Sequence, residues 1–379
     1  MKMTLKGFTA GEKSGGLVLI VCTLVSLFLA NSGIAERYLS LWHFEIGGHS
    51  FEHWINDGLM TIFFLLVGLE LIQEIYEGEL SNIKTALLPI SGALGGMLLP
   101  AFIYILFNHN MSTHSGFGIP MATDIAFALG ILSLLGRRVP LPLKIFLTAL
   151  AVIDDLGAII VIAIFYTTSL AWTNLLVSLG IFVLLLVLNK IFNVRYLIVY
   201  IAGGVVMWYF MLHSGVHATI AGVLVAIAIP IKKKDNKCLS ARMQKWLRKP
   251  IALGVLPLFA LANTAIFIDD RWQQAISKPF ALGIIFGLVA GKPLGIMLFT
   301  FVSVKLKLCN LPTGVKWKEL FGVGLLGGIG FTMSIFITLL AFDDTYHINE
   351  SKLMILLAST FAGILGFIWL NFVLKEKNR

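Results

Sequence analysis

Apolar stretches recur almost without pause from Leu17 to Leu374. A span needs about 20 mostly apolar residues to cross a hydrocarbon core about 30 Å thick. Gly, Pro and charged clusters separate the stretches and predict an all-α polytopic membrane protein, with residues 1–379 forming a single transmembrane domain. About twelve spans are expected, at 11–31, 54–76, 86–107, 117–135, 143–167, 173–190, 196–210, 214–231, 248–268, 280–303, 319–342 and 352–374. The seventh and eighth are short and are interpreted as a compressed pair that turns at 213–215.

The Lys and Arg residues predict how these spans are oriented. If the N-terminus is cytoplasmic, 24 of the 29 fall in cytoplasmic segments, including a basic loop at 232–247. Positive residues favour the cytoplasmic side, so both termini are expected there. The net charge of +9 is thus explained by topology, and no nucleic-acid partner is expected. The four external cations are Arg37, Arg271, Lys278 and Lys352, and the remaining one, Lys292, lies inside an apolar run.

The connection between the first two spans, residues 37–52, alternates apolar and polar residues around Gly47 and Gly48. This alternation predicts a small external β-hairpin. An ordinary external loop is the alternative.

Four acids fall inside apolar segments, where a charge is costly unless it faces a cavity or a partner. They are Asp57, Asp124, Asp154 and Asp155. Asp154 and Asp155 are adjacent, and successive helical residues point about 100° apart, so both carboxylates can line one cavity. The alternative is that both are structural, which requires two buried partners.

Carboxylate oxygens suit a hard cation, and the same oxygens can hold a proton. A cation and protons would therefore compete for one buried site, and this competition is already an exchange mechanism. The hypothesis is that cytoplasmic alkalinisation removes the protons and admits the cation.

Two spans also contain helix-weakening residues in the membrane. The first stretch, 118–124, contains Pro120, and the second, 326–334, has three glycines in four residues. They interrupt spans 4 and 11, at corresponding positions of two oppositely directed trios, spans 3–5 and 10–12, which predicts an inverted repeat around a binding site. Asp124 would balance the positive N-termini of the half-helices and Lys292 the negative C-termini. Alternatively, Lys292 pairs with Asp154 or Asp155.

Seven motifs, taken together and in order, resemble the NhaA-type sodium/proton antiporters over nearly the whole chain. The resemblance implies a bacterial inner-membrane protein of twelve helices, with the interrupted fourth and eleventh crossing, which is often a homodimer through the external hairpin. It also implies electrogenic exchange of one sodium or lithium ion against two protons, activated at alkaline pH, for sodium and pH homeostasis. The motifs are Trp54–Asp57, Phe63–Glu70, Ala122–Ala128, Ile153–Ala158, Ser214–Thr219, Gly291–Gly295 and Gly330–Ile335.

The resemblance also implies roles for single residues. Sodium and protons would bind at Asp154 and Asp155, with Thr123 and Asp124 near the helix crossing. Lys292 would be the compensating cation and a partner of Asp154. Asp57 would lie beside the external passage.

Glu70, Glu74 and His217 would contribute to the pH response. The chain departs from the family pattern here, because Ile72 and Gln73 replace a basic pair before Glu74, and 242–245 lack an expected acidic residue. The activating pH is therefore not predicted. His217 could instead be a packed histidine, or could share a metal with His213 four residues earlier, although Gly215 between them argues against a metal pair.

No cofactor is expected, because the sequence shows neither a phosphate-binding loop nor a convincing pair of haem-ligating histidines. Cys22, Cys238 and Cys309 share no close spacing. The expected partners are sodium or lithium ions, protons, membrane lipid and a second copy of the chain. The competing functions are a proton-relaying subunit of a redox enzyme and a passive cation channel.

Overall fold

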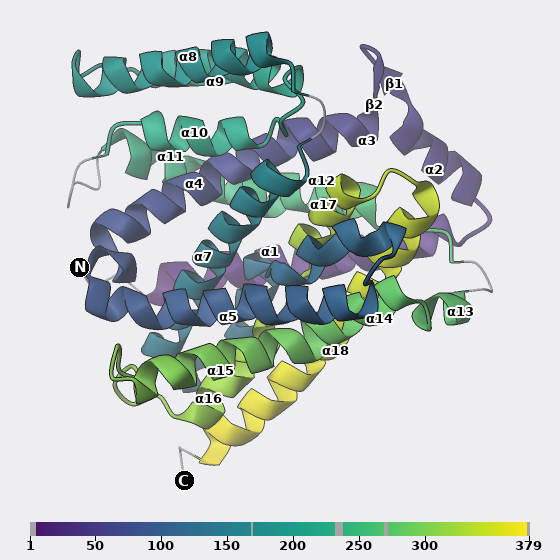
Figure 1. The fold of residues 1–379 in the computed structure, drawn as a ribbon, viewed down its shortest axis with the longest axis vertical. Helices are drawn as coiled ribbons and strands as arrows, with labels where there is room; N and C mark the ends of the chain where they lie inside the picture. Colours follow the sequence, from purple (N-terminus) through teal and green to yellow (C-terminus); the bar gives the residue numbers. More distant parts are fainter. Residues whose placement is uncertain (1–4, 168–169, 232–237, 269–271, 377–379) are drawn as a thin grey trace.

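The computed structural model describes residues 5–167, 170–231, 238–268 and 272–376 (Figure 1). This part of the chain is helical apart from its connections and one antiparallel pair of two-residue strands, β1 (Glu45–Ile46) and β2 (His49–Ser50). The first nine α-helices are α1 (Leu5–Ala30), α2 (Ala35–His43), α3 (Phe51–His53), α4 (Met60–Glu77), α5 (Ile83–Phe107), α6 (Ile125–Leu134), α7 (Leu141–Phe165), α8 (Trp172–Lys190) and α9 (Leu197–Leu212). The others are α10 (Ile220–Ala228), α11 (Leu239–Pro250), α12 (Leu256–Asn263), α13 (Trp272–Ile276), α14 (Pro279–Phe286), α15 (Lys292–Lys305), α16 (Trp317–Gly327), α17 (Phe331–Ala341) and α18 (Thr345–Glu376).

Short helices of other types join or interrupt these. The 3₁₀ segments are η2 (Glu79–Ser81), η3 (Ser112–Met121) and η4 (Gly136–Arg138). The π-helical segments η1 (Trp54–Leu59), η5 (Ile251–Val255) and η6 (Gly287–Gly291) lie within longer helices. A π-helical turn inside an α-helix is often found at a functional site, and two of these segments contain or adjoin predicted site residues.

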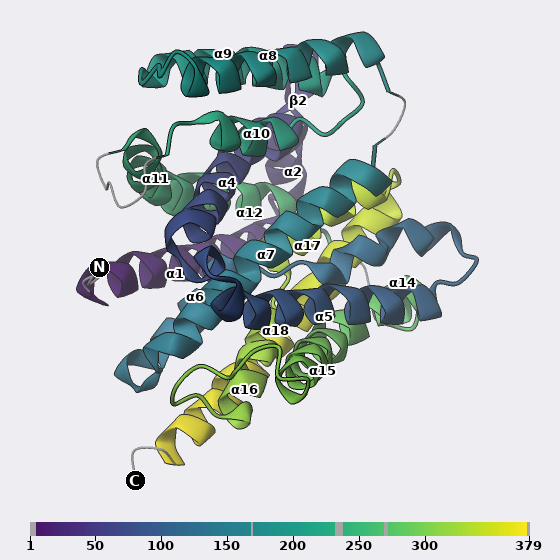
Figure 2. The same cartoon turned by 60° about the vertical axis from the view of Figure 1, so that its left-hand side comes forward.

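The helices are stacked in layers. In both views α8 and α9 lie side by side at one edge of the molecule, α10 and α11 form the next layer, and α15 and α16 lie toward the opposite edge (Figures 1 and 2). α7 passes through the middle. Only 11% of the most apolar stretch of α8 is buried inside the protein, so its apolar side chains form an outer face suited to lipid.

By length and composition, six described helical segments can each cross a membrane, and up to nine can if each of three bent pairs counts as one span. The chain is thus a multi-pass, all-helical membrane protein. The predicted count of twelve remains a prediction, because α9 and α10, which occupy predicted spans 7 and 8, have 16 and nine residues. α1 begins on the side that carries the α4–α5 and α15–α16 connections, and the β-hairpin lies on the opposite side (Figure 1).

Two segments predicted as connections also contain helix. Residues 239–247, assigned to the basic loop, form most of α11, because Ser240, Met243, Gln244 and Leu247 repeat at helical spacing and bury one face. The connection at 37–52 contains the end of α2 as well as the strands, which pair Glu45 with Ser50 and Ile46 with His49. Residues 232–237 lie outside the described residues. The external position of the hairpin stays a prediction.

A very close helix crossing joins α5 and α15, which belong to different trios of the predicted repeat. A Cβ atom on Gly95 would lie 2.1 Å from the Gly295 carbonyl oxygen, and a Cβ atom on Gly295 would lie 2.0 Å from the Gly95 carbonyl oxygen. The contact is reciprocal, and only glycine permits it. Small residues at such crossings let membrane helices approach backbone to backbone.

We expect Gly95→Ala to lower the melting temperature of the purified protein, because the new methyl group forces α5 and α15 apart. The cost of such overpacking is about 1–3 kcal/mol or more. The matched control is Gly180→Ala in α8, where a Cβ atom would meet nothing within 4 Å. Melting of both variants in detergent tests this, and equal melting temperatures would contradict it.

Candidate ion-binding site

Two interrupted helices cross at the centre of the protein. The helix axis bends by 41° between η3 and α6, and by 45° between α16 and α17. The breaks touch directly, because the Asp124 N–H donates a hydrogen bond of 2.7 Å to the Ile329 carbonyl. The interruptions predicted in spans 4 and 11 are therefore confirmed. Each break frees backbone groups that cannot remain unpaired in a membrane interior.

The Asp124 carboxylate caps both of the half-helices that begin at the crossing. Its Oδ1 accepts a 2.9 Å hydrogen bond from the Phe127 N–H in the first turn of α6. Its Oδ2 accepts from the Thr332 N–H of α17 at 3.1 Å and from the Thr332 hydroxyl. One negative charge thus serves two positive helix ends, which is the geometry expected for charge compensation.

Lys292 begins α15 directly after the π-helical segment η6, and its side chain is fully buried. Its Nζ lies 3.0 Å from Asp154 Oδ2 and also donates to the Met121 carbonyl at the end of η3. The two contacts that the sequence offered as alternatives are therefore both present. A fully buried ion pair needs such additional hydrogen bonds to offset the cost of removing both charges from water.

Thr123 connects the crossing to the carboxylate pair. Its hydroxyl lies 2.8 Å from Asp154 Oδ2 and 2.9 Å from the Gly327 carbonyl of the opposite break. A hydroxyl has a single proton, so it donates to one of these oxygens at a time and its lone pairs remain available. Thr123 is therefore held beside Asp154, where its hydroxyl oxygen could serve as a further ligand.

Asp154 and Asp155 follow one another in α7 and are 0% and 2% exposed. Asp154 Oδ1 and Asp155 Oδ1 are both buried and have no hydrogen-bond partner among the described residues. A buried oxygen without a partner is unfavourable, and a bound cation or proton would satisfy it. Carboxylate and hydroxyl oxygens also match the preference of a hard cation, so these residues fit a sodium ion as well as protons.

The other predicted site residues lie elsewhere. Asp57 is in η1, where its Oδ2 lies 3.2 Å from His53 Nε2. Glu70 pairs with Arg248 at 3.0 Å, and Glu74 accepts from the Glu79 N–H at 3.1 Å. In the described structure none of these acids makes a hydrogen bond or ion pair with Asp154 or Asp155.

His217 also lies apart from the carboxylate pair, since its Nε2 contacts the Tyr166 carbonyl at 2.9 Å. His213 contacts the Tyr209 carbonyl of its own helix at 2.8 Å. Within the described ranges no group of three or more His, Cys, Asp or Glu residues could hold a metal ion. The structure therefore gives no support to a metal site at His213 and His217.

Several contacts were not predicted from the sequence. The Met121 and Gly327 carbonyls are backbone groups, and no residue type identifies a carbonyl as a ligand. Thr332 belongs to the motif Gly330–Ile335. It lies two residues after a glycine in the break, and this position is the feature of the sequence that could have indicated a capping role. Arg248 as the partner of Glu70 could not be foreseen, because the residues are far apart in sequence.

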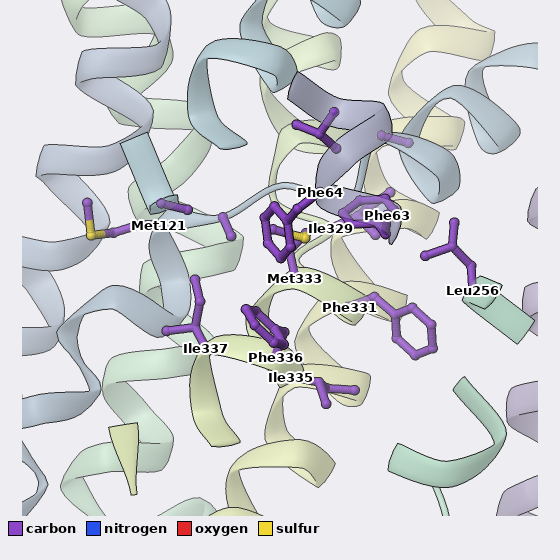
Figure 3. Close-up of a cluster of buried hydrophobic side chains, with 14 of the residues drawn as sticks. Phe63, Phe64, Met121, Leu256, Ile329, Phe331, Met333, Ile335, Phe336 and Ile337 are labelled. Atoms are coloured by element: carbon purple, nitrogen blue, oxygen red, sulfur yellow. The ribbon is translucent and has the colours of Figure 1, made fainter. Parts of the chain in front are cut away.

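An apolar cluster encloses the break in span 11. Phe63 and Phe64 of α4 lie beside Ile329 and Met333, and Phe336 lies farther along α17 (Figure 3). The rings of Phe64 and Phe336 are 5.4 Å apart between centroids. These side chains exclude water from this part of the crossing and so strengthen the electrostatic interactions of the buried charges.

Crossed, interrupted helices with buried ionisable groups at mid-protein are typical of secondary transporters. The chain belongs to the Na⁺/H⁺ antiporter 1 family, whose sequence model matches residues 6–370. It is 59% identical to the Na⁺/H⁺ antiporter NhaA of Flavobacterium psychrophilum, over 99% of this chain and 98% of the relative. It is 46% identical to the Na⁺/H⁺ antiporter NhaA of Vibrio parahaemolyticus, over 100% and 99%.

The fold is also similar to that of a solved structure, the sodium proton antiporter MjNhaP1 from Methanocaldococcus jannaschii. The TM-score is 0.54 over 98% of both chains, at 15% sequence identity. This likeness concerns the fold alone.

We expect Lys292→Met to lower the melting temperature strongly, because it leaves the buried Asp154 carboxylate without its counter-ion. Breaking a buried pair in this way typically costs about 3–5 kcal/mol. The double variant Asp154→Asn, Lys292→Met should lose less than the sum of the two single variants, because neither residue then leaves an isolated charge.

The matched control is Lys305→Met, an exposed cation at the far end of the same helix. It should melt close to the wild type. If the losses of stability in the two single variants simply add in the double variant, the 3.0 Å contact between Lys292 and Asp154 contributes no coupling energy.

Proposed function

We propose that the protein exchanges cytoplasmic sodium or lithium for external protons. The observation that carries this proposal is the pair of unpartnered oxygens, Asp154 Oδ1 and Asp155 Oδ1, buried beside the crossing of two broken helices. The family and the names of the relatives support sodium and protons as the exchanged ions. The protein is a secondary transporter in this proposal and performs no chemical conversion.

The exchange follows from competition at the two carboxylates. Sodium would bind to Asp154 Oδ1, Asp155 Oδ1 and the Thr123 hydroxyl, while Asp154 Oδ2 stays engaged with Lys292. Protons arriving on the carboxylates remove the charge that holds sodium. Two carboxylates can take two protons and one sodium ion carries one charge, so an exchange in this ratio is electrogenic and is driven by the proton gradient and the membrane potential.

The proposed architecture is a twelve-span domain over 1–379, with inverted repeats in spans 3–5 and 10–12 and both termini in the cytoplasm of a bacterium. The reciprocal Gly95–Gly295 contact and the paired breaks support the repeat. Broken helices let a central site be exposed to either side in turn, as alternating access requires.

The pH response is proposed to depend on groups outside the central cluster. The Glu70–Arg248 ion pair links α4 to α11, and Glu74 lies one turn farther along α4. His217 contacts the end of α7, the helix that carries both carboxylates. These contacts support a role for the three residues in activation at alkaline pH, in the service of sodium and pH homeostasis.

Asp57 is proposed to lie beside the external passage. The β1–β2 hairpin projects from the side of the molecule where α3 begins, which supports its use as the contact of an external homodimer (Figure 1).

In everted vesicles with a preformed pH gradient, added sodium should collapse the gradient, and Asp154→Asn or Asp155→Asn should each abolish the response. Asp343→Asn, an exposed carboxylate in the α17–α18 connection, is the matched control and should respond like the wild type. Wild-type exchange in either Asp154 or Asp155 variant would refute the site. Sodium flux that moves no protons against their gradient would identify a channel instead.

Competition also predicts how sodium and pH interact. Raising the sodium concentration tenfold should move the pH of half-maximal exchange toward acid. More sodium can displace the protons at a lower pH, where the proton concentration is higher. The shift should be about one unit if one proton competes, and about half a unit if two protons leave together. Proton flux in reconstituted vesicles measures this, and a pH midpoint that does not respond to sodium would contradict competition at one site.

A further inference from the structure

The half-helix α17 begins inside the protein, and its first N–H groups have no partners within the helix. Asp124 accepts only the Thr332 N–H among the first three. The hydroxyl oxygen of Ser359 in α18 accepts the other two, from Gly330 at 3.2 Å and from Phe331 at 3.1 Å. Ser359 is 5% exposed, and its hydroxyl is the acceptor that the described structure gives to both amides.

In the proposed repeat Ser359 lies close to the position in the second trio that corresponds to Asp154 in the first. Thr123, at the first break, contacts Asp154 31 residues later on the third helix of its trio. Gly330, at the second break, contacts Ser359 29 residues later on the third helix of the other trio. In each trio a residue at the break is thus bonded to the third helix, through two side chains in the first trio and through backbone N–H groups to a neutral hydroxyl in the second.

We infer that Ser359 is a positioning residue for ion exchange at Asp154 and Asp155, an inference that rests on the function proposed above. Ser359 fixes the start of α17, which places Thr332 against the Asp124 carboxylate. Asp124 is bonded through its own N–H to the second break, and the neighbouring Thr123 contacts Asp154. A shift of α17 would therefore also move the hydroxyl oxygen of Thr123, which is a proposed ligand of the ion.

The buried charges at the crossing explain why a neutral serine suits position 359. Asp124, Asp154 and Asp155 share the buried crossing with one lysine, Lys292. Another carboxylate at 359 would add a fourth negative charge there. A hydroxyl accepts from two amides without adding charge, whereas a methyl group would leave both amides unpaired, at the full cost of their desolvation.

The surroundings of Ser359 allow a clean test. A cavity of about 380 Å³ lies beside it, lined by Phe127, Phe331 and Leu356 among others, so Ser359→Thr can keep the hydroxyl and place its methyl group in free space. Ser133 in α6 offers a matched control. It is 4% exposed and its hydroxyl donates only to Gly130 of the same helix, so Ser133→Ala leaves no amide unpaired.

The experiment measures sodium-dependent proton exchange of wild type, Ser359→Ala, Ser359→Thr and Ser133→Ala in reconstituted vesicles across pH. Ser359→Ala should raise the KM for sodium about fivefold or more, through loss of the acceptor for two buried amides, and should displace the pH profile. Ser359→Thr and Ser133→Ala should stay within about twofold of the wild type, because each retains every acceptor for those amides.

A lower melting temperature of Ser359→Ala with an unchanged KM and pH profile would reduce Ser359 to a structural residue and overturn the inference. If Ser359→Ala does not accumulate, Ser359→Cys replaces it, because a thiol is a weaker acceptor of similar size. Its KM should then rise in the same direction, and a wild-type KM would again overturn the inference. A wild type without sodium-dependent exchange would instead refute the proposed function.

Discussion

The backbone groups freed at two helix breaks impose the constraint on which the rest of the structure depends. Lipid offers them no hydrogen-bond partner in a bilayer interior, and here protein side chains pair them. Asp124 and Ser359 accept from the N–H groups, while Lys292 and Ser334 donate to the carbonyls of Met121 and Ile119. The position of each polar side chain at the crossing is thus decided by which end of a half-helix it faces.

This pairing leaves an imbalance that gives the protein its chemistry. Asp124 is fully used in capping, and one oxygen of Asp154 is used by Lys292 and Thr123. One oxygen of Asp154 and one of Asp155 have no hydrogen-bond partner in the described part of the chain. The same arrangement that satisfies the breaks therefore presents two buried oxygens that a bound ion or proton would satisfy.

The sequence predicted a feature of the site where a residue type is unusual in an apolar membrane span. Prolines and glycines within apolar stretches located both breaks, and a lone lysine between apolar residues had to meet carbonyls or carboxylates. The sequence did not predict a role where the residue is of a type that is common in its surroundings. Serine is common in membrane helices, so Ser359 carries no signal of its own. The helix α11 was not predicted because its many charged residues are also typical of a loop. Such roles depend on distances between segments far apart in sequence.

The contact between Gly95 and Gly295 has a consequence for how this chain can change over generations. At Gly157 the obstacle to a larger residue is the side chain of Met97, so a second substitution could make room. At Gly95 and Gly295 the obstacle is the backbone of the other helix, which every amino acid possesses. A substitution at the facing position therefore cannot make room, and each of the two glycines is constrained independently of the residue opposite it.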